Sequence, residues 1–118
     1  MELNPVLVDG QVIGGIAQGA GQALMEQMVY DSDGQVLTGS FMDYCMPRAS
    51  DVPFIEVHSN PYPTKLNPLG VKGAGEAGTV GAMPAVMNAI YNVLYKFNVL
   101  SIDMPVTSEK IWRAINSK

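Results

Sequence analysis

The sequence predicts an α+β fold in which three helices are combined with short strands and a glycine-rich loop. Three stretches of the chain carry apolar residues at every third or fourth position, which is helical spacing. Between the first two stretches lie turn residues, prolines and one short apolar run, which are typical of hairpins and strands. No internal repeat or linker divides the sequence, so we expect residues 1–118 to form a single unit.

Composition indicates a folded chain and argues against two classes of partner. Hydrophobic residues make up 47% of the 118 positions and charged residues 15%, which is too apolar and too weakly charged for a disordered protein. The net charge is −4, and the seven Lys and Arg residues form no basic run. These properties argue against a nucleic-acid or anionic-membrane surface.

Cysteine usage and hydropathy predict a soluble protein. The lone Cys45 cannot form an internal disulfide, and no Cys/His cluster has the spacing of a metal site, so no protein metal ligand is predicted. No secretory signal opens the chain, and no apolar run reaches the roughly 20 residues of a membrane span. A cytoplasmic location is therefore predicted.

The first helix is predicted within residues 6–28, with Asp9 as its N-cap. It is rich in glycine, and each glycine costs up to about 1 kcal/mol relative to alanine in a helix interior. Because glycine lets another helix or a ligand approach the backbone closely, we expect a tertiary contact to stabilise this helix. The glycines are Gly10, Gly14, Gly15, Gly19 and Gly21.

Four further elements are predicted from the rest of the sequence. A hairpin with an Asp-Gly turn covers residues 29–37, and a short strand covers residues 54–58. The second helix covers residues 83–97 with Pro84 near its first turn, which leaves residues 73–81 as an extended loop. The third helix begins after its cap, Thr107. It spans residues 108–115 and is expected to turn Ile111, Trp112 and Ile115 inward.

Residues 73–78 read Gly-Ala-Gly-Glu-Ala-Gly, which satisfies the Gly-x-Gly-x-x-Gly pattern of dinucleotide-binding folds. That fingerprint follows a β-strand and opens a helix. Here Pro61, Pro63 and Pro68 occupy the approach, and the predicted helix starts only near Pro84. A dinucleotide site is therefore not predicted.

Two polar residues, Glu76 in the loop and Gln18 on the first helix, are candidates for a functional site. A glycine-rich loop can bring a single side chain such as Glu76 against a bulky ligand. A solvated loop glutamate is the commoner explanation for such a residue, and a solvated glutamine is the commoner one for Gln18. Taken one at a time, the two residues leave both explanations open.

Three segments taken together resemble the xanthine dehydrogenase/aldehyde oxidase family of molybdenum hydroxylases. The resemblance is to the C-terminal part of the molybdopterin-binding large subunit, nearest the carbon monoxide dehydrogenase large-chain group, and it covers nearly the whole chain. The segments are Gly14-Gly15-Ile16-Ala17-Gln18-Gly19-Ala20-Gly21-Gln22-Ala23-Leu24, Val71-Lys72-Gly73-Ala74-Gly75-Glu76 and Pro84-Ala85-Val86-Met87-Asn88-Ala89-Ile90.

The resemblance implies a site and a set of cofactors. By it, Glu76 is the active-site glutamate, which acts as a general base. The implied cofactor is molybdopterin, as molybdenum cytosine dinucleotide, with the metal held by the pterin dithiolene instead of by protein side chains. Iron–sulfur clusters and FAD are implied on partner subunits. The implied cofactor contacts are Gln18, Gly19, Lys72, Gly73, Ala74 and Gly75.

Two functions remain open from the sequence. The first is a part of a molybdenum hydroxylase that is inactive without the remainder of the large subunit; the helical pattern that starts almost at residue 1 favours a split or truncated subunit. The second is a non-catalytic remnant or interaction module that binds a partner chain. In both cases the glycine-rich helix and apolar faces lack their cover in the isolated chain, so we expect it to self-associate.

Overall fold

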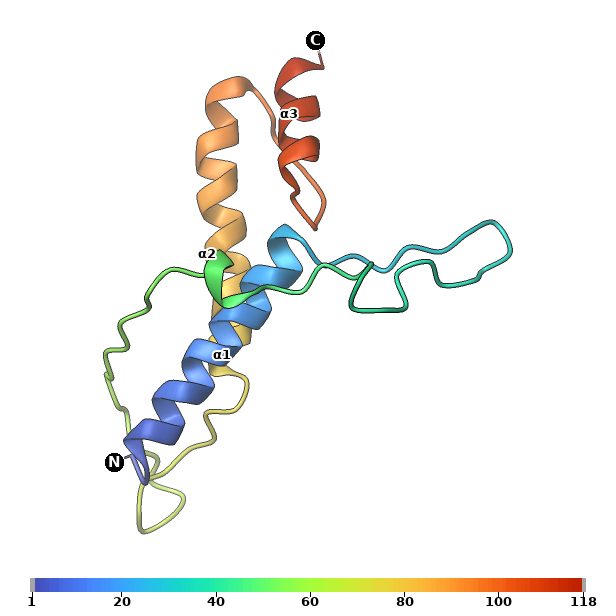
Figure 1. The fold of residues 1–118 in the computed structure, drawn as a ribbon. Helices are drawn as coiled ribbons and strands as arrows, with labels where there is room; N and C mark the ends of the chain where they lie inside the picture. Colours follow the sequence, from blue (N-terminus) through green and yellow to red (C-terminus); the bar gives the residue numbers. More distant parts are fainter. Residues whose placement is uncertain (1, 118) are drawn as a thin grey trace.

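The computed structural model describes residues 2–117, and within them it contains three α-helices. These are α1 (Pro5–Leu24), α2 (Ala77–Leu94) and α3 (Ser108–Asn116), with short 3-10 helices η1 (Ala49–Asp51) and η2 (Tyr95–Phe97). Figure 1 shows α1 crossing the lower part of α2, α3 beside the upper part of α2, and a long connection between α1 and α2. None of the helices in the described part is long and apolar enough to cross a membrane.

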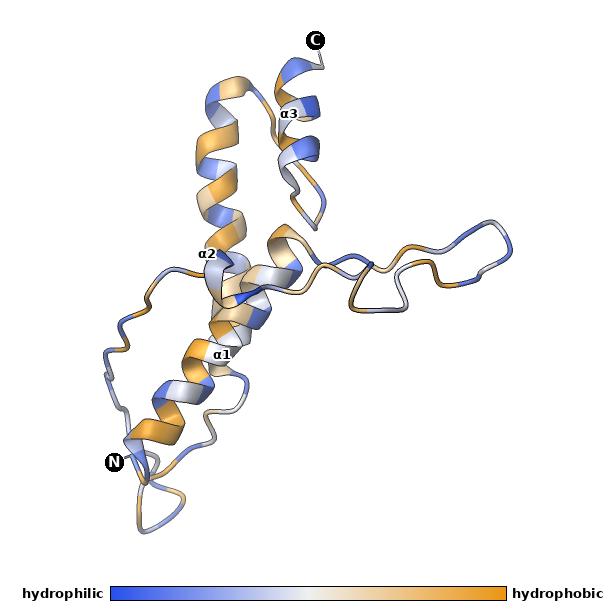
Figure 2. Cartoon of the chain, viewed as in Figure 1, coloured by the Kyte–Doolittle hydropathy of each residue, from blue (hydrophilic) through white to orange (hydrophobic). Residues whose placement is uncertain are grey.

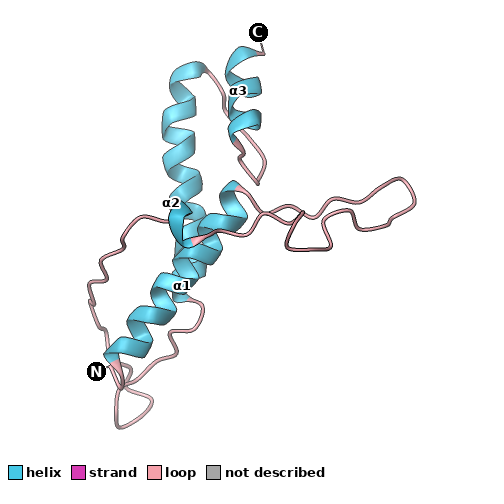
Figure 3. Ribbon diagram, in the orientation of Figure 1, coloured by secondary structure: helices cyan, strands magenta, loops and turns pink. Residues whose placement is uncertain are grey.

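The predicted α+β class is wrong in its β part. Between residues 2 and 117 the structure has no strand, only an isolated antiparallel bridge between Tyr30 and Val36 (Figure 3). That bridge belongs to the predicted Asp-Gly hairpin, in which Gly34 adopts a positive φ of 81°. The predicted strand at residues 54–58 pairs with no other segment of residues 2–117, so it forms no ladder.

Helix α1 begins earlier than the sequence pattern predicted. Its N-cap is Asn4, whose side-chain oxygen accepts a hydrogen bond from the backbone N–H of Leu7 at 3.2 Å, and Pro5 occupies the first turn. The prediction that Asp9 is the N-cap is therefore wrong. The side chain of Asn4 satisfies a free backbone N–H of the first turn, and the ring of Pro5 fixes φ near its helical value. The helix therefore starts before the apolar residues with helical spacing begin.

Helix α2 also begins earlier than predicted, at Ala77 instead of residue 83. Pro84 lies inside the helix, where its missing N–H leaves the carbonyl of Val80 without its usual helical donor. The predicted loop over residues 73–81 therefore ends at Glu76. Because the helix opens within the Gly-x-Gly-x-x-Gly pattern, only the absence of a strand before it, within the described residues, still argues against a dinucleotide site.

The two long helices pack through glycine. A Cβ atom added at Gly15 would lie 2.9 Å from the backbone nitrogen of Thr79, and one added at Gly19 would lie 2.8 Å from the Cβ of Ala82. On α2, Gly78 lies against the backbone of Val12 and Gly15. The expected tertiary contact of the glycine-rich helix is thus confirmed as a close helix crossing, and it fixes the start of α2 on one face of α1.

The small core lies between α1, α2 and the segment that leads into α3. It is built around Ala23, Met87 and Val106, and the backbone N–H of Val106 donates to the carbonyl of Ala23 at 2.7 Å.

The Thr107 cap of α3 is confirmed, since its side chain accepts from the backbone N–H of Lys110. Trp112, however, is 66% exposed, so the prediction that it faces inward is wrong. Figure 2 shows hydrophobic and hydrophilic bands alternating along α2, which supplies Met87 to this core.

Candidate functional site

Glu76 stands at the N-terminus of α2, where it is the N-cap residue. It is exposed, its backbone is at φ −102° and ψ −6°, and its side chain makes no capping hydrogen bond. The amides of the first helical turn behind it have no helical acceptor and carry the positive end of the helix dipole. A carboxylate that is free to reach outward therefore lies beside a group of backbone donors.

Two glutamine side chains of α1 hold the segments on either side of Glu76. The Nε2 of Gln11 donates to the carbonyl of Gly75 at 2.8 Å. The hydroxyl of Thr79 donates to the Oε1 of Gln18 at 3.1 Å. The structure therefore places Gln18 against the first turn of α2, close in space to the loop that carries Glu76.

Sequence reasoning missed Gln11 and Thr79 as members of this site. Gln11 precedes Gln18 by seven residues, two helical turns, so the two side chains share one face of α1. That spacing was a usable signal, but its importance depends on α2 starting at Ala77, six residues before the predicted start. With the helix start misplaced, Thr79 was read as part of a loop.

The predicted contacts on the loop before Glu76 lie at the surface. Gly73 and Gly75 are exposed, and a Cβ atom added at either would meet nothing within 4 Å. Lys72 lies over the ring of Tyr62, with its Nζ 5.2 Å from the ring centroid. A shallow pocket of about 170 Å³ is lined in part by Lys72, Gly73 and Ala74. The backbone of this loop is thus open to a ligand.

Gly19 is placed differently from the other predicted contacts. It is buried, and its missing side chain makes room for Thr79 and Ala82 of α2. The structure therefore places Gln18 against Thr79 in the first turn of α2, which follows Gly75 and Glu76, but covers Gly19 with a helix.

Comparison with known proteins identifies the kind of molecule to which this arrangement belongs. Residues 2–53 match the family model described as a molybdopterin cofactor-binding domain. The nicotine 6-hydroxylase large subunit of Paenarthrobacter nicotinovorans is 40% identical over 95% of this chain. The crystal structure of quinoline 2-oxidoreductase from Pseudomonas putida 86 matches 98% of the chain at 40% identity, with a TM-score of 0.91. The chain belongs to the molybdenum hydroxylase family.

The chain spans only a small part of the length of its relatives. It covers 14% of the nicotine 6-hydroxylase large subunit. It also covers 14% of the carbon monoxide dehydrogenase large chain of Hydrogenophaga pseudoflava, to which it is 33% identical over 96% of its own length. The quinoline 2-oxidoreductase chain is covered to 15%. The predicted family resemblance, including its likeness to the carbon monoxide dehydrogenase large chain, is confirmed.

The donor groups of the site fit a metal that is brought by a cofactor. In residues 2–117 no group of three or more His, Cys, Asp or Glu side chains is placed to hold a metal ion. What the site offers instead is an outward carboxylate, an amide side chain and an open glycine backbone at a helix N-terminus. Backbone amides and a helix N-terminus suit an anionic ligand, which a pterin phosphate would be.

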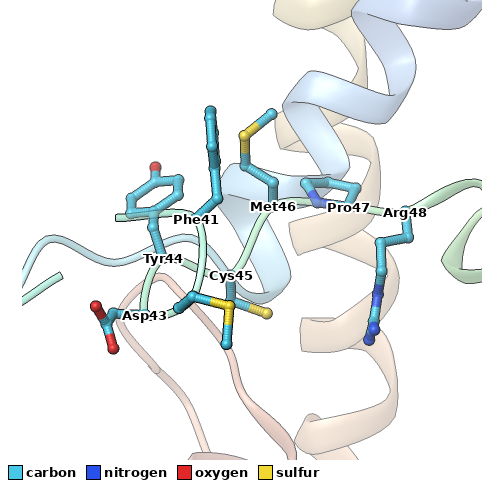
Figure 4. A pocket seen from close by; sticks show the side chains of 8 residues that line it. Phe41, Asp43, Tyr44, Cys45, Met46, Pro47 and Arg48 are labelled. Atoms are coloured by element: carbon cyan, nitrogen blue, oxygen red, sulfur yellow. The ribbon is translucent and has the colours of Figure 1, made fainter. Parts of the chain in front are cut away.

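A separate surface pocket of about 390 Å³ lies on the loop after α1 and is lined by residues 41–48, without Glu76 or Gln18. Figure 4 shows the side chains of Phe41, Tyr44 and Met46 on one side of the backbone there and that of Cys45 on the other. The Tyr44 hydroxyl donates to Glu26 of the turn after α1 at 2.7 Å, and this hydrogen bond raises the pKa of Tyr44 above its ordinary value. The contact anchors the loop on that turn.

Proposed function

We propose that this chain forms part of the large subunit of a molybdenum hydroxylase and that Glu76 is its general base. The observation that carries the proposal is the position of Glu76. Its exposed carboxylate stands at the start of α2, and the neighbouring Thr79 is bonded to Gln18 on α1. A base needs to lie within hydrogen-bond reach of the proton that it removes, and an outward side chain on a fixed helix start supports that role.

The same residues would hold the cofactor. Molybdopterin, proposed in its molybdenum cytosine dinucleotide form, supplies the Lewis acid and the two-electron acceptor of the hydroxylation when it is bound. Gln18 would contact it through its amide, and the open backbone of Gly73, Ala74 and Gly75 would lie against it. Lys72 could leave the Tyr62 ring and offer a positive charge. Gly19 would support the site indirectly, because its missing side chain lets α2 pack close to Gln18.

The part of the reaction that belongs to this chain is proton transfer. In its ionised form, the Glu76 carboxylate accepts a proton at one of its two oxygens from a hydrogen-bonded donor. Gln18, whose Oε1 already accepts from Thr79, has its Nε2 left to donate. Around the first turn of α2 the two residues therefore provide one acceptor and one donor.

We also propose the partners that the whole enzyme requires. Residues 1–118 act as one unit of the cofactor-binding domain, and the remainder of the large subunit completes the site. Separate iron–sulfur and FAD subunits carry the electrons away, in a cytoplasmic enzyme. One relative is named as a subunit of a dehydrogenase complex, the 6-hydroxypseudooxynicotine dehydrogenase complex subunit gamma, which supports an assembly of several chains.

Replacing Glu76 by glutamine tests the general-base assignment. In the complete enzyme, assembled with its iron–sulfur and flavin subunits, we expect Glu76→Gln to lower kcat by about 10²- to 10⁴-fold, because glutamine cannot accept the proton. Molybdenum and pterin content, measured by mass spectrometry, should stay unchanged. The matched control is Glu56→Gln, which removes an exposed carboxylate whose neighbour is His58.

Two outcomes would count against the proposal. Wild-type turnover in the Glu76→Gln enzyme would contradict the general-base assignment. An assembled wild-type enzyme that holds neither molybdenum nor pterin would instead favour the second function, a non-catalytic module that binds a partner chain.

A further inference from the structure

The side chain of Gln11 ties the loop that carries Glu76 to α1. Its Nε2 donates to the carbonyl oxygen of Gly75 at 2.8 Å, across the gap between α1 and the start of α2. Gly75 is the residue immediately before Glu76. Its carbonyl lies outside the helical ladder of α2, whose first bond runs from the N–H of Val80 to the carbonyl of Glu76 at 3.0 Å.

These two hydrogen bonds fix both peptide planes that flank Glu76. A peptide unit is planar, so holding the Gly75 oxygen holds the whole plane between Gly75 and Glu76. The bond from Val80 holds the plane on the other side. With both planes fixed, the direction of the Glu76 Cα–Cβ bond is fixed, and only the side-chain torsions remain free.

Glycine makes the Gln11 contact necessary. A Cβ atom at Gly75 would meet nothing within 4 Å, so no neighbouring group packs on that side of this exposed residue. Glycine itself tolerates a wide range of φ and ψ, so without an anchor the plane before Glu76 could rotate. We propose that Gln11 is a positioning residue, which holds the Gly75–Glu76 peptide so that the Glu76 carboxylate points into the site. This inference rests on the proposed function of Glu76.

Gln11→Glu is the sharpest test, because it keeps the shape of the side chain and removes the donor. An ionised carboxylate has no hydrogen to donate and would place an oxygen against the Gly75 oxygen. In the complete enzyme we expect kcat to fall on the order of tenfold with KM nearly unchanged, since small displacements of a reacting group cost large factors in rate. Gln11→Ala should behave alike, with unchanged molybdenum and pterin content.

A second measurement does not depend on turnover. Amide hydrogen exchange in the cofactor-free enzyme should become faster at residues 73–79 in Gln11→Glu, and stay at the wild-type rate in the rest of α1 and α2. The matched control is Gln22→Glu, which makes the same change at an exposed position of α1. Within residues 2–117 Gln22 makes no side-chain hydrogen bond.

The outcomes separate the two proposals. Wild-type kcat and wild-type exchange in Gln11→Glu, with Glu76→Gln inactive, would overturn the role of Gln11 and leave Glu76 as the base. Faster exchange throughout both helices would also overturn it, because the residue would then be merely structural. Full turnover in Glu76→Gln would overturn the function itself and the positioning role with it.

Discussion

Gly78 lies where α2 meets the backbone of α1, two residues after Glu76. A Cβ atom there would overlap the carbonyl oxygen of Val12 and would lie 3.1 Å from the Cα of Gly15. Backbone atoms cannot move aside as the end of a flexible side chain can, so any larger residue forces the helices apart. Because Glu76 belongs to the same helix start, a change at Gly78 moves it as well.

Alanine substitution at this position should therefore destabilise the protein. We expect Gly78→Ala to lower the free energy of unfolding by about 1–3 kcal/mol, the usual cost of overpacking, despite the better helix propensity of alanine. Gly81→Ala on the same helix is the control, since a Cβ there meets nothing within 4 Å. It should stabilise the protein by up to about 1 kcal/mol. Equal melting temperatures for the two variants would contradict this packing account.

Single residues were only partly predictable from the sequence. The glycine-rich pattern of α1 predicted a close approach to its backbone, yet could not tell Gly15 and Gly19, which face α2, from Gly10 and Gly14, which face open space. That distinction requires the position of the partner helix. Gln11 was missed for the same reason, because its acceptor lies on a distant segment whose path no local pattern predicts.

Among the elements, α3 depends most on its cap. It has nine residues, and helices shorter than about 12–15 residues are marginal in water without support. The side chain of Thr107 accepts a hydrogen bond from Lys110 at its start, and the preceding residue, Val106, is tied to Ala23 of α1. The cap and this tether together place α3 beside α2.

Removing the cap should loosen α3 selectively. We expect Thr107→Ala to cost about 1 kcal/mol of stability and to speed amide exchange at residues 108–116 while α1 and α2 stay protected. Ser108→Ala, at the neighbouring exposed position, serves as control and should change little. Uniform protection of α3 in both variants would show that packing against α2 alone holds it.

Helices were predicted better than strands for a physical reason. A helix closes its hydrogen bonds within its own segment, so local signals such as the Thr107 cap and the apolar spacing suffice. A strand exists only with a partner, and residues 54–58 have none among the described residues. The start of α2 was misjudged because Pro84 outweighed the tertiary contact at Gly78, which only the fold reveals.

The molecule as a whole is far from compact. Its radius of gyration is 18.0 Å, whereas about 13.5 Å is expected for a compact domain of this length. Its accessible surface is 9125 Å², against about 6,200 Å² for a compact monomer of its mass. Many large apolar side chains lie in the open, with Phe41, Phe54 and Leu66 at least 88% exposed.

Such a surface should drive association when the chain is alone. Large exposed apolar patches are normally covered by a partner. Helices α2 and α3 share an apolar groove of about 340 Å³ whose lining includes Ile90, Val93 and Ile111. We expect the chain alone to form oligomers above its 12.7 kDa monomer mass in light scattering, increasingly so at higher concentration. Val93→Lys should weaken this association, because it places a charge in the groove, whereas Glu109→Lys on the polar side of α3 should not. A single monodisperse monomer at high concentration would mean that these apolar faces are covered within the chain itself, contrary to the open arrangement of its helices.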